Sequence, residues 1–312
     1  MKPYHTLLVG AALNDRDSAT LAHAAWFARA MGSRLVYFAH VVPTFDMPDG
    51  MAEKDHDAFK PRDEEIEAKL NDLLGRTPNL FATGTTVRPT VRQGSLVPEL
   101  LRLASQKSAD LLVLGRPSSD GSHPLSQAAH QLVRQSPCSV FTVPSNSELV
   151  CRRILVPVDF SDRSHESINT ACTLARAVPN TSVVVQNTYE VPMGWHKTVH
   201  SYEDFAALMK QNAERHWKKF TSTADFTGVN VEARFDLGDD VPGTILRVAE
   251  EIDASLVVMG SHGRTLPAEF LLGHVADKVC ARTSRPVLCV KRKGEVVNLL
   301  HALLQIFNFE DK

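Results

Sequence analysis

The sequence predicts an α/β protein of two tandem, doubly wound domains, each a five-stranded parallel sheet flanked by about four helices. Two observations lead to this fold class. Residues 7–43 align with residues 154–190 at a constant offset of 147, and the same offset aligns 138–143 with 285–290. Within each unit, short apolar runs alternate with segments of helical spacing, which is typical of parallel strands covered by helices on both faces.

The second unit shows the order of elements most clearly. Apolar runs predict strands and longer amphipathic stretches predict helices, with Ser161 and Asp162 as capping residues ahead of the first helix. The expected elements are strand 154–158, helix 164–178, strand 182–189, helix 204–220, strand 230–237, helix 241–252, strand 255–260, helix 274–283 and strand 286–291.

The length of 312 residues fits two domains of ordinary size. We expect the first domain at residues 1–146 and the second at 151–293, joined near the segment "PSNSELVCR". Beyond the last strand, residues 294–312 carry apolar residues at helical spacing. This segment is therefore expected to form a C-terminal helix that covers its own domain or a partner.

Composition excludes several classes of protein. The net charge of −2, from 34 basic and 36 acidic residues, gives no field that would attract nucleic acid. The five cysteines form no C-x-x-C pair, which favours buried thiols in a reducing compartment, and the histidines predict no metal site. Because no apolar run reaches 18 residues, we expect no membrane span and a cytoplasmic location.

Three glycines follow the fourth strand of the second unit, at positions 260, 263 and 273. Gly260 ends a buried strand, Gly263 can adopt a positive φ, and Gly273 precedes a helix start with unpaired N–H groups. The spacing matches neither the Walker pattern nor G-x-G-x-x-G. A simple turn is the alternative, but three glycines at this spacing favour an anion site.

These residues carry a family resemblance. The G-x-x-G-x9-G spacing, the "ILVPVD" opening, the "GSHGRT" segment and the closing "RPVLCVK" resemble the universal stress protein (UspA) family, in a tandem two-domain form with an adenine-nucleotide alpha-hydrolase-like fold. ATP-binding members use the acidic residue after the first strand for the nucleoside, groups after the second strand for adenine, and the glycine loop for phosphates. The resemblance thereby implicates Val158, Asp159, Thr188, Gly260, Ser261, His262, Gly263, Arg264, Gly273, His274 and Val275.

Two departures from the family pattern bear on function. His274 stands where nucleotide-binding members usually have Ser or Thr after the third glycine, and its imidazole can still donate to a phosphate. In the first unit, Ala12 replaces the carboxylate of Asp159, and Ser118 and Ser126 replace the second and third glycines. The first unit is therefore expected to keep the fold and to lack the nucleotide site.

The resemblance implies a stress-response or regulatory factor that binds ATP, with or without Mg²⁺, in its second domain. One alternative is a scaffold that binds no nucleotide and acts through domain pairing and the C-terminal helix; another is a weak ATPase. The sequence contains no G-x-S-x-G elbow and no evident general base, so it does not predict an efficient enzyme. The two domains are expected to pair about a pseudo-twofold axis, and a homodimer is a further expectation.

Overall fold

The fold is taken from a computed structural model, which describes residues 4–14, 16–44, 63–76, 79–117, 126–199, 201–222, 224–261 and 273–291. In the first domain, strands and helices alternate along the chain. They are β1 (Thr6–Gly10), α1 (Arg16–Met31), β2 (Leu35–Val42), α2 (Asp63–Gly75), β3 (Thr86–Gln93), α3 (Leu96–Gln106), β4 (Leu111–Arg116), α4 (Gln127–Gln135) and β5 (Ser139–Pro144).

The second domain repeats this order, with one short 3₁₀ helix, η1, added before its second long helix. Its elements are β6 (Arg153–Pro157), α5 (Asp162–Ala177), β7 (Ser182–Tyr189), η1 (Trp195–Lys197), α6 (Tyr202–Thr221), β8 (Asn230–Leu237), α7 (Val241–Glu251), β9 (Leu256–Gly260), α8 (His274–Arg282) and β10 (Val287–Val290). Each element that the sequence predicts in this domain is present, with ends that differ by up to two residues.

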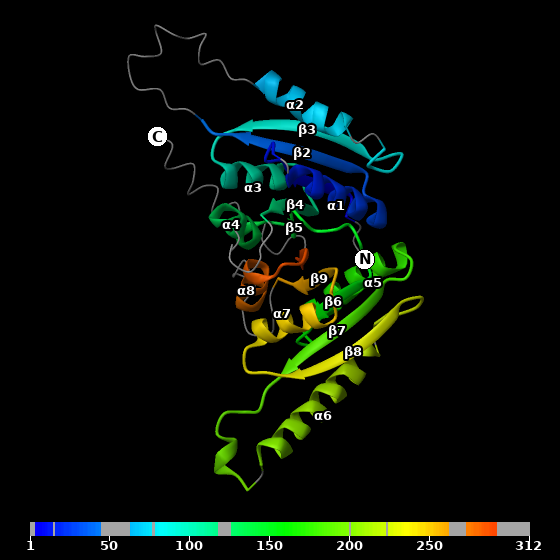
Figure 1. Ribbon diagram of the computed structural model, residues 1–312, viewed down its shortest axis with the longest axis vertical. Coiled ribbons are helices and arrows are strands. Elements are labelled where there is room, and N and C mark those ends of the chain that lie inside the picture. Colours follow the sequence, from blue (N-terminus) through cyan, green and yellow to red (C-terminus); the bar gives the residue numbers. More distant parts are fainter. Residues whose placement is uncertain are drawn as a thin grey trace, which may run out of the picture.

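The ten strands form one continuous sheet in the order β3-β2-β1-β4-β5-β10-β9-β6-β7-β8. Strands within each domain are parallel, whereas β5 and β10 pair antiparallel where the domains meet. Leu288 pairs with Phe141, its own counterpart at the offset of 147, so a pseudo-twofold axis passes between them. The α/β fold class and the pairing of the two domains are thus confirmed, and Figure 1 shows the domains end to end.

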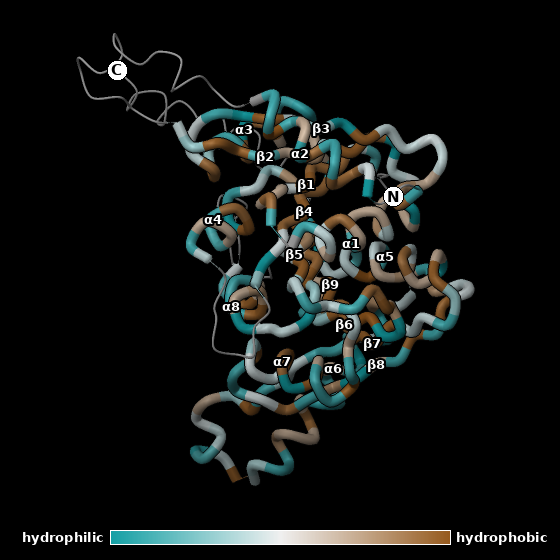
Figure 2. The backbone as a smooth tube through the Cα atoms, turned by 45° about the horizontal axis from the view of Figure 1, so that its top comes forward, coloured by the Kyte–Doolittle hydropathy of each residue, from teal (hydrophilic) through white to brown (hydrophobic). Residues whose placement is uncertain are grey.

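Helices cover both faces of this sheet, and each face has one apolar core that crosses the domain boundary. One core joins side chains of α3 and α4 to those of α7 and α8, and the other joins α1 and α2 to α5 and α6. Figure 2 shows apolar residues concentrated along the central strands and polar residues toward the outer helices. Because the cores are continuous, the two domains stabilise each other through burial of apolar surface.

Lys291, directly after β10, ties the second domain to the first. Its Nζ atom donates to the carbonyl oxygens of Val133, Arg134 and Ser136, at 2.9, 3.2 and 3.0 Å, at the C-terminal end of α4. A cation is favoured there because unpaired carbonyls and the helix dipole make a helix C-terminus negative. Burial nevertheless lowers the pKa of Lys291 to about 8.

Arg116 makes the reciprocal connection from the first domain. Its guanidinium donates to the carbonyl oxygens of Thr283 and Arg285, at 2.6 and 3.0 Å, just beyond α8. Burial lowers the pKa of Arg116 to about 10. Close by in the interface, His130 Nε2 lies 2.6 Å from Asp277 Oδ1. A partner for His130 could not be predicted from the sequence, because Asp277 lies on α8 of the other domain.

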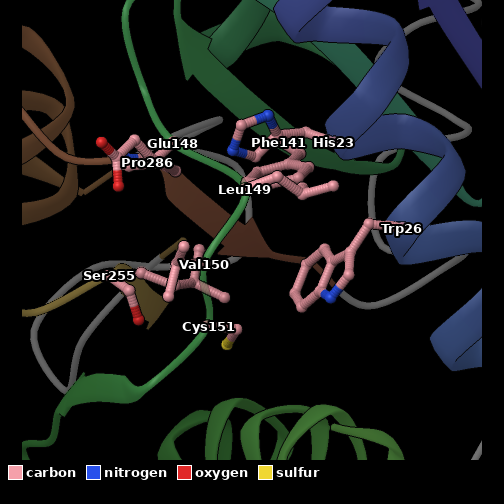
Figure 3. Close-up of a pocket in the computed structure, with 10 residues that line it drawn as sticks. His23, Trp26, Phe141, Glu148, Leu149, Val150, Cys151, Ser255 and Pro286 are labelled. Atoms are coloured by element: carbon pink, nitrogen blue, oxygen red, sulfur yellow. The ribbon is translucent and has the colours of Figure 1, made fainter.

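The linker between the domains runs past α1 and closes a small crevice. Figure 3 shows Trp26, from α1, and the linker residues Val150 and Cys151 around this space. Its volume is about 10 Å³, room for a single water molecule, so this crevice is a packing feature. Cys151 is half-buried and the other four cysteines are buried, and none of these five described residues forms a disulfide.

None of the helices in the part of the chain that the structure describes is both long and apolar enough to cross a bilayer. Residues 294–312, for which the sequence predicts a C-terminal helix, lie outside the described residues. The same holds for His262, Gly263 and Arg264 of the glycine loop and for Ser118 in the first domain.

Candidate functional site

A cavity of about 450 Å³ opens at the carboxyl ends of β6, β7 and β9. Strand order reverses at this point, since β7 follows β6 on one side while β9 lies on the other. Doubly wound sheets bind ligands at such a switch point, because the loops leave in opposite directions and open a crevice between them. The first turns of α7 and α8 complete the walls.

The structure brings together every predicted site residue that it describes. Those that line the cavity are Val158, Asp159, Thr188, Gly260, Ser261, Gly273, His274 and Val275. Besides these residues, the cavity is lined by Pro157, Ser164, Gln186, Asn187, Glu190, Val241, Ile245, Met259 and Ala276. Most of these residues are apolar or lie within strands and helices, where the sequence does not distinguish them from residues of the hydrophobic core.

Asp159 follows β6 and organises the loop that leads into α5. Its Oδ1 atom accepts from the Ser161 N–H at 3.0 Å and from the Ser164 hydroxyl at 2.9 Å. Phe160, between them, adopts a positive φ of 62°, which the tight turn requires. The carboxylate is therefore held in a fixed position at the cavity wall.

The predicted capping role of Ser161 is only half right. Ser161 occupies the N-cap position of α5, but its side chain makes no capping hydrogen bond. The loop is held instead by Asp159, whose carboxylate accepts a hydrogen bond from the Ser161 N–H. A carboxylate two residues before the N-cap residue thus accepts the hydrogen bond that stabilises this turn.

The N-terminus of α8 faces the cavity, and its N-cap residue is a glycine, which has no side chain that could cap the helix. Gly273 is the N-cap residue, and its N–H donates to the Ser261 carbonyl at 2.6 Å, which fixes the start of the helix. The first N–H groups of a helix have no acceptor within the helix, and the helix dipole adds partial positive charge there. His274, Val275 and Ala276, whose N–H groups these are, all line the cavity.

The charges of the cavity wall favour a bound anion only next to the N-terminus of α8. Among the described wall residues there are two carboxylates, Asp159 and Glu190, and neither lysine nor arginine. The positive end of α8 lies in the same cavity, and His274 at its first position is exposed. A ligand with an anionic end and a neutral, hydroxyl-bearing end therefore matches the cavity better than a simple anion.

The end of β7 supplies a set of buried polar side chains. Asn187 donates to the Val158 carbonyl at 2.8 Å and joins β7 to the loop after β6. On the opposite face of the strand, Gln186 Nε2 donates to Thr188 Oγ1 at 2.9 Å and to Asp236 Oδ2 at 3.3 Å. Asp236 also pairs with Arg234 at 2.8 Å, which fixes its carboxylate.

The first domain uses the corresponding positions differently. Ala12 stands in place of Asp159, and the carboxylate of Asp17, in the first turn of α1, accepts from the N–H groups of Ala12 and Asn14. At the start of α4, the Ser126 hydroxyl accepts from the Ala129 N–H at 3.3 Å. The N-cap position that is a glycine in the second domain is thus a capping serine in the first.

The fold and this site define a tandem α/β protein with a crevice at the switch point of its second domain. The model of the universal stress protein family matches residues 3–144 and 151–291. The chain therefore belongs to the universal stress protein family, with two copies of its domain.

Individual relatives agree with this assignment. Universal stress protein MJ0531 of Methanocaldococcus jannaschii is 30% identical over 148 residues, which cover 47% of this chain and 86% of the relative. A universal stress protein from Archaeoglobus fulgidus superposes with a TM-score of 0.62 at 18% identity, over 93% of this chain and 99% of its own. Protein PA1789 of Pseudomonas aeruginosa superposes with a TM-score of 0.67 at 15% identity, over 97% of both chains. These two structures show the fold alone.

Proposed function

We propose that the second domain binds an adenine nucleotide, ATP, in the cavity at the switch point, and that the chain acts as a nucleotide-responsive regulatory factor in the stress response. The observation that carries this proposal is the N-terminus of α8, whose N-cap residue is a glycine and which lines the same cavity as the carboxylate of Asp159. Its N–H groups suit phosphate oxygens. Asp159 suits the ribose hydroxyls, which donate hydrogen bonds to a carboxylate.

The first domain serves, in this proposal, as the structural partner of the second. Asp17, in the first turn of α1, is 2% exposed and accepts from backbone N–H groups, and Ser126 caps the N-terminus of α4. Its sheet and core are complete, because packing and ligand binding make separate demands on a sequence.

Identification of the small molecules that accompany the purified chain tests this proposal. The protein is denatured, and the released compounds are identified by mass spectrometry and quantified against the chain. ATP or ADP, close to one per chain, is the expected result. A chain that releases no nucleotide and shows no calorimetric response to ATP, with or without Mg²⁺, contradicts the proposal and favours the nucleotide-free scaffold.

Gly273→Ser tests the open helix terminus directly. A hydroxyl at this position would accept from the Ala276 N–H, as Ser126 does from Ala129 in the first domain. We expect the affinity for ATP to fall by roughly tenfold, because one donor is withdrawn from the phosphates. The free energy of unfolding should change by less than about 0.5 kcal/mol, since glycine and serine are both good N-cap residues.

Gly273→Ala is the matched control, because it adds a Cβ atom without a hydrogen-bond acceptor. Calorimetry with ATP on the three proteins should rank the affinities as wild type, then Gly273→Ala, then Gly273→Ser. Equal affinities for all three would show that the terminus of α8 does not contact the ligand. An equal loss in both variants would assign the effect to crowding by the new side chain.

A further inference from the structure

Exposed apolar side chains gather on the segment that follows β7. Of the eight large apolar side chains that are exposed in the described part of the chain, five lie there or beside it: Met193, Val199, Tyr202, Leu208 and Leu237. The first four belong to residues 191–199 and 201–209, which we call the β7–α6 arm. Two of them, Met193 and Val199, are 100% and 99% exposed. Apolar residues grouped in this way mark an interaction surface.

The β7–α6 arm has a defined structure of its own. The rings of Trp195 and Tyr202 pack edge to face, with their centroids 5.5 Å apart. At the start of α6, Ser201 and Asp204 form a capping box, with hydrogen bonds of 3.1 and 3.0 Å. Figure 1 shows the arm beyond the end of β7, next to α6. A surface that is already formed loses less conformational entropy when a partner binds.

The other three exposed apolar side chains, Leu96, Leu149 and Val150, lie at the opposite edge of the sheet. Leu149 and Val150 belong to the linker, which leads to the amino end of β6. Leu96 follows the carboxyl end of β3, in the domain whose strands run antiparallel to those of the second. Among the described residues, the arm and the adjacent end of β8 therefore hold the large apolar side chains exposed at the carboxyl edge of the second domain.

The last described residue, Lys291, lies at this same edge. β10, β9, β6 and β7 are parallel neighbours in that order, so their carboxyl ends lie along one edge. Three strand spacings separate the end of β10 from the end of β7, which amounts to about 14 Å. Residues 294–312 would extend over about 28 Å as a helix. They can therefore reach the β7–α6 arm from the end of β10.

The sequence of residues 294–312 matches an apolar surface. Its apolar stripe, at helical spacing, consists of Val296, Leu299, Leu300, Leu303, Leu304 and Phe307. A segment tethered so close to the arm has an effective concentration on the order of millimolar, which a second copy reaches only in very concentrated solution. The tether favours the chain's own segment over a second copy as the occupant of the arm.

We propose that residues 294–312 dock with their apolar stripe on the β7–α6 arm of the same chain. A segment that runs from β10 to the arm crosses the mouth of the cavity, because the ends of β9 and β6, which frame the cavity, lie between β10 and β7. The docked segment thereby slows the exchange of a bound nucleotide. This second step rests on the proposed function, whereas the docking itself does not.

Hydroxyl-radical footprinting of the full chain tests the docking, with Met193 as the reporter. Mass spectrometry measures the conversion of its thioether to the sulfoxide, which increases with exposure. The double substitution Leu300→Asp and Leu303→Asp places two charges in the apolar stripe. It should raise the rate of Met193 oxidation at least about fivefold over wild type. Met259, which is 4% exposed, should be oxidised slowly in both proteins.

Gln305→Asp is the matched control, because residue 305 lies opposite the stripe on a helix. It should leave the oxidation of Met193 as slow as in wild type. Equal rates in wild type and the stripe variant overturn the docking. Protection of Met193 that is lost on dilution, with a dimer in sedimentation, assigns the arm to a second copy and overturns it as well.

Release of radiolabelled ATP into excess unlabelled ATP tests the effect on the cavity. The stripe variant should release ATP at least about threefold faster than wild type, since no docked segment crosses the mouth. Equal release rates, with Met193 oxidation changed as expected, overturn the crossing of the mouth and leave the docking and the proposed function standing. A wild-type chain that binds no ATP overturns the proposed function and the effect on exchange, and Met193 oxidation still decides the docking.

Discussion

Lys291→Met is expected to lower the free energy of unfolding at pH 7 by about 2 kcal/mol. Three carbonyl oxygens at the end of α4 lose their shared donor, and the two domains lose a polar contact across their interface. The loss is partly offset, because a buried ammonium is costly and its pKa is lowered to about 8. Urea unfolding of the wild type and the variant measures the net effect.

The effect of Lys291→Met should depend on pH in a definite direction. The pKa of Lys291 is about 8 in the folded chain, below its ordinary value of 10.5. Between these values the unfolded chain binds more protons, so the contribution of Lys291 to stability rises with pH. The destabilisation caused by the substitution should therefore grow by about 2 kcal/mol from pH 8 to pH 10.

Lys278→Met, an exposed lysine on α8, is the matched control. It should change the free energy of unfolding by less than about 0.5 kcal/mol at every pH. A Lys291→Met protein as stable as wild type at pH 7 would show that the cost of burying the ammonium cancels its three hydrogen bonds. A difference that shrinks between pH 8 and pH 10 would contradict the assigned pKa shift.

Asp159→Ala is expected to weaken ATP binding by roughly 30-fold or more, which corresponds to about 2 kcal/mol. The substitution removes the carboxylate assigned to the ribose hydroxyls, and it also releases the Ser161 N–H and the Ser164 hydroxyl from their acceptor. Both effects act on the same wall of the cavity. Calorimetry with ATP measures the loss, and circular dichroism confirms the fold.

Two further variants separate the effects on the ligand and on the loop. Asp159→Asn keeps an oxygen for Ser161 and Ser164 and removes the charge, so its affinity for ATP should lie between those of wild type and Asp159→Ala. Asp225→Ala removes an exposed carboxylate in the turn before β8, outside the cavity wall, and should leave binding unchanged. Unaltered affinity in Asp159→Ala would exclude this residue from the site.

Much of the fold could be predicted because its signals are local. Apolar runs such as "ILVPV" and "SLVVMG" are too short and too continuous for surface helices, so they predict buried strands. The repeat at an offset of 147 supports these assignments, because the corresponding segments of the two domains should have the same structure. The pairing of the two domains about a pseudo-twofold axis was expected, and the structure shows that β5 and β10 form this contact. Helix ends were less well predicted, since α5 begins at Asp162 through the turn that Asp159 organises.

The contacts between the domains could not be predicted, because they join residues that are far apart in the sequence. Lys291 follows the last strand as an ordinary solvated lysine would, and only the packing of α4 beside β10 shows that it is buried. Arg116 likewise reads as the polar end of a strand. Gln186 did leave a signal, since it interrupts the apolar run "SVVVQNTY", but a lone polar residue near a strand end is usually solvated.

The number of ATP molecules bound per chain tests the central claim most directly, because the two domains share a fold and differ at the site. Titration calorimetry of the full chain, stripped of small molecules by partial denaturation and refolding, gives this number. One ATP per chain, lost in Asp159→Ala, is the predicted result. Two per chain would show that the first domain binds as well despite Ala12 and Ser126, and none would contradict nucleotide binding by this protein.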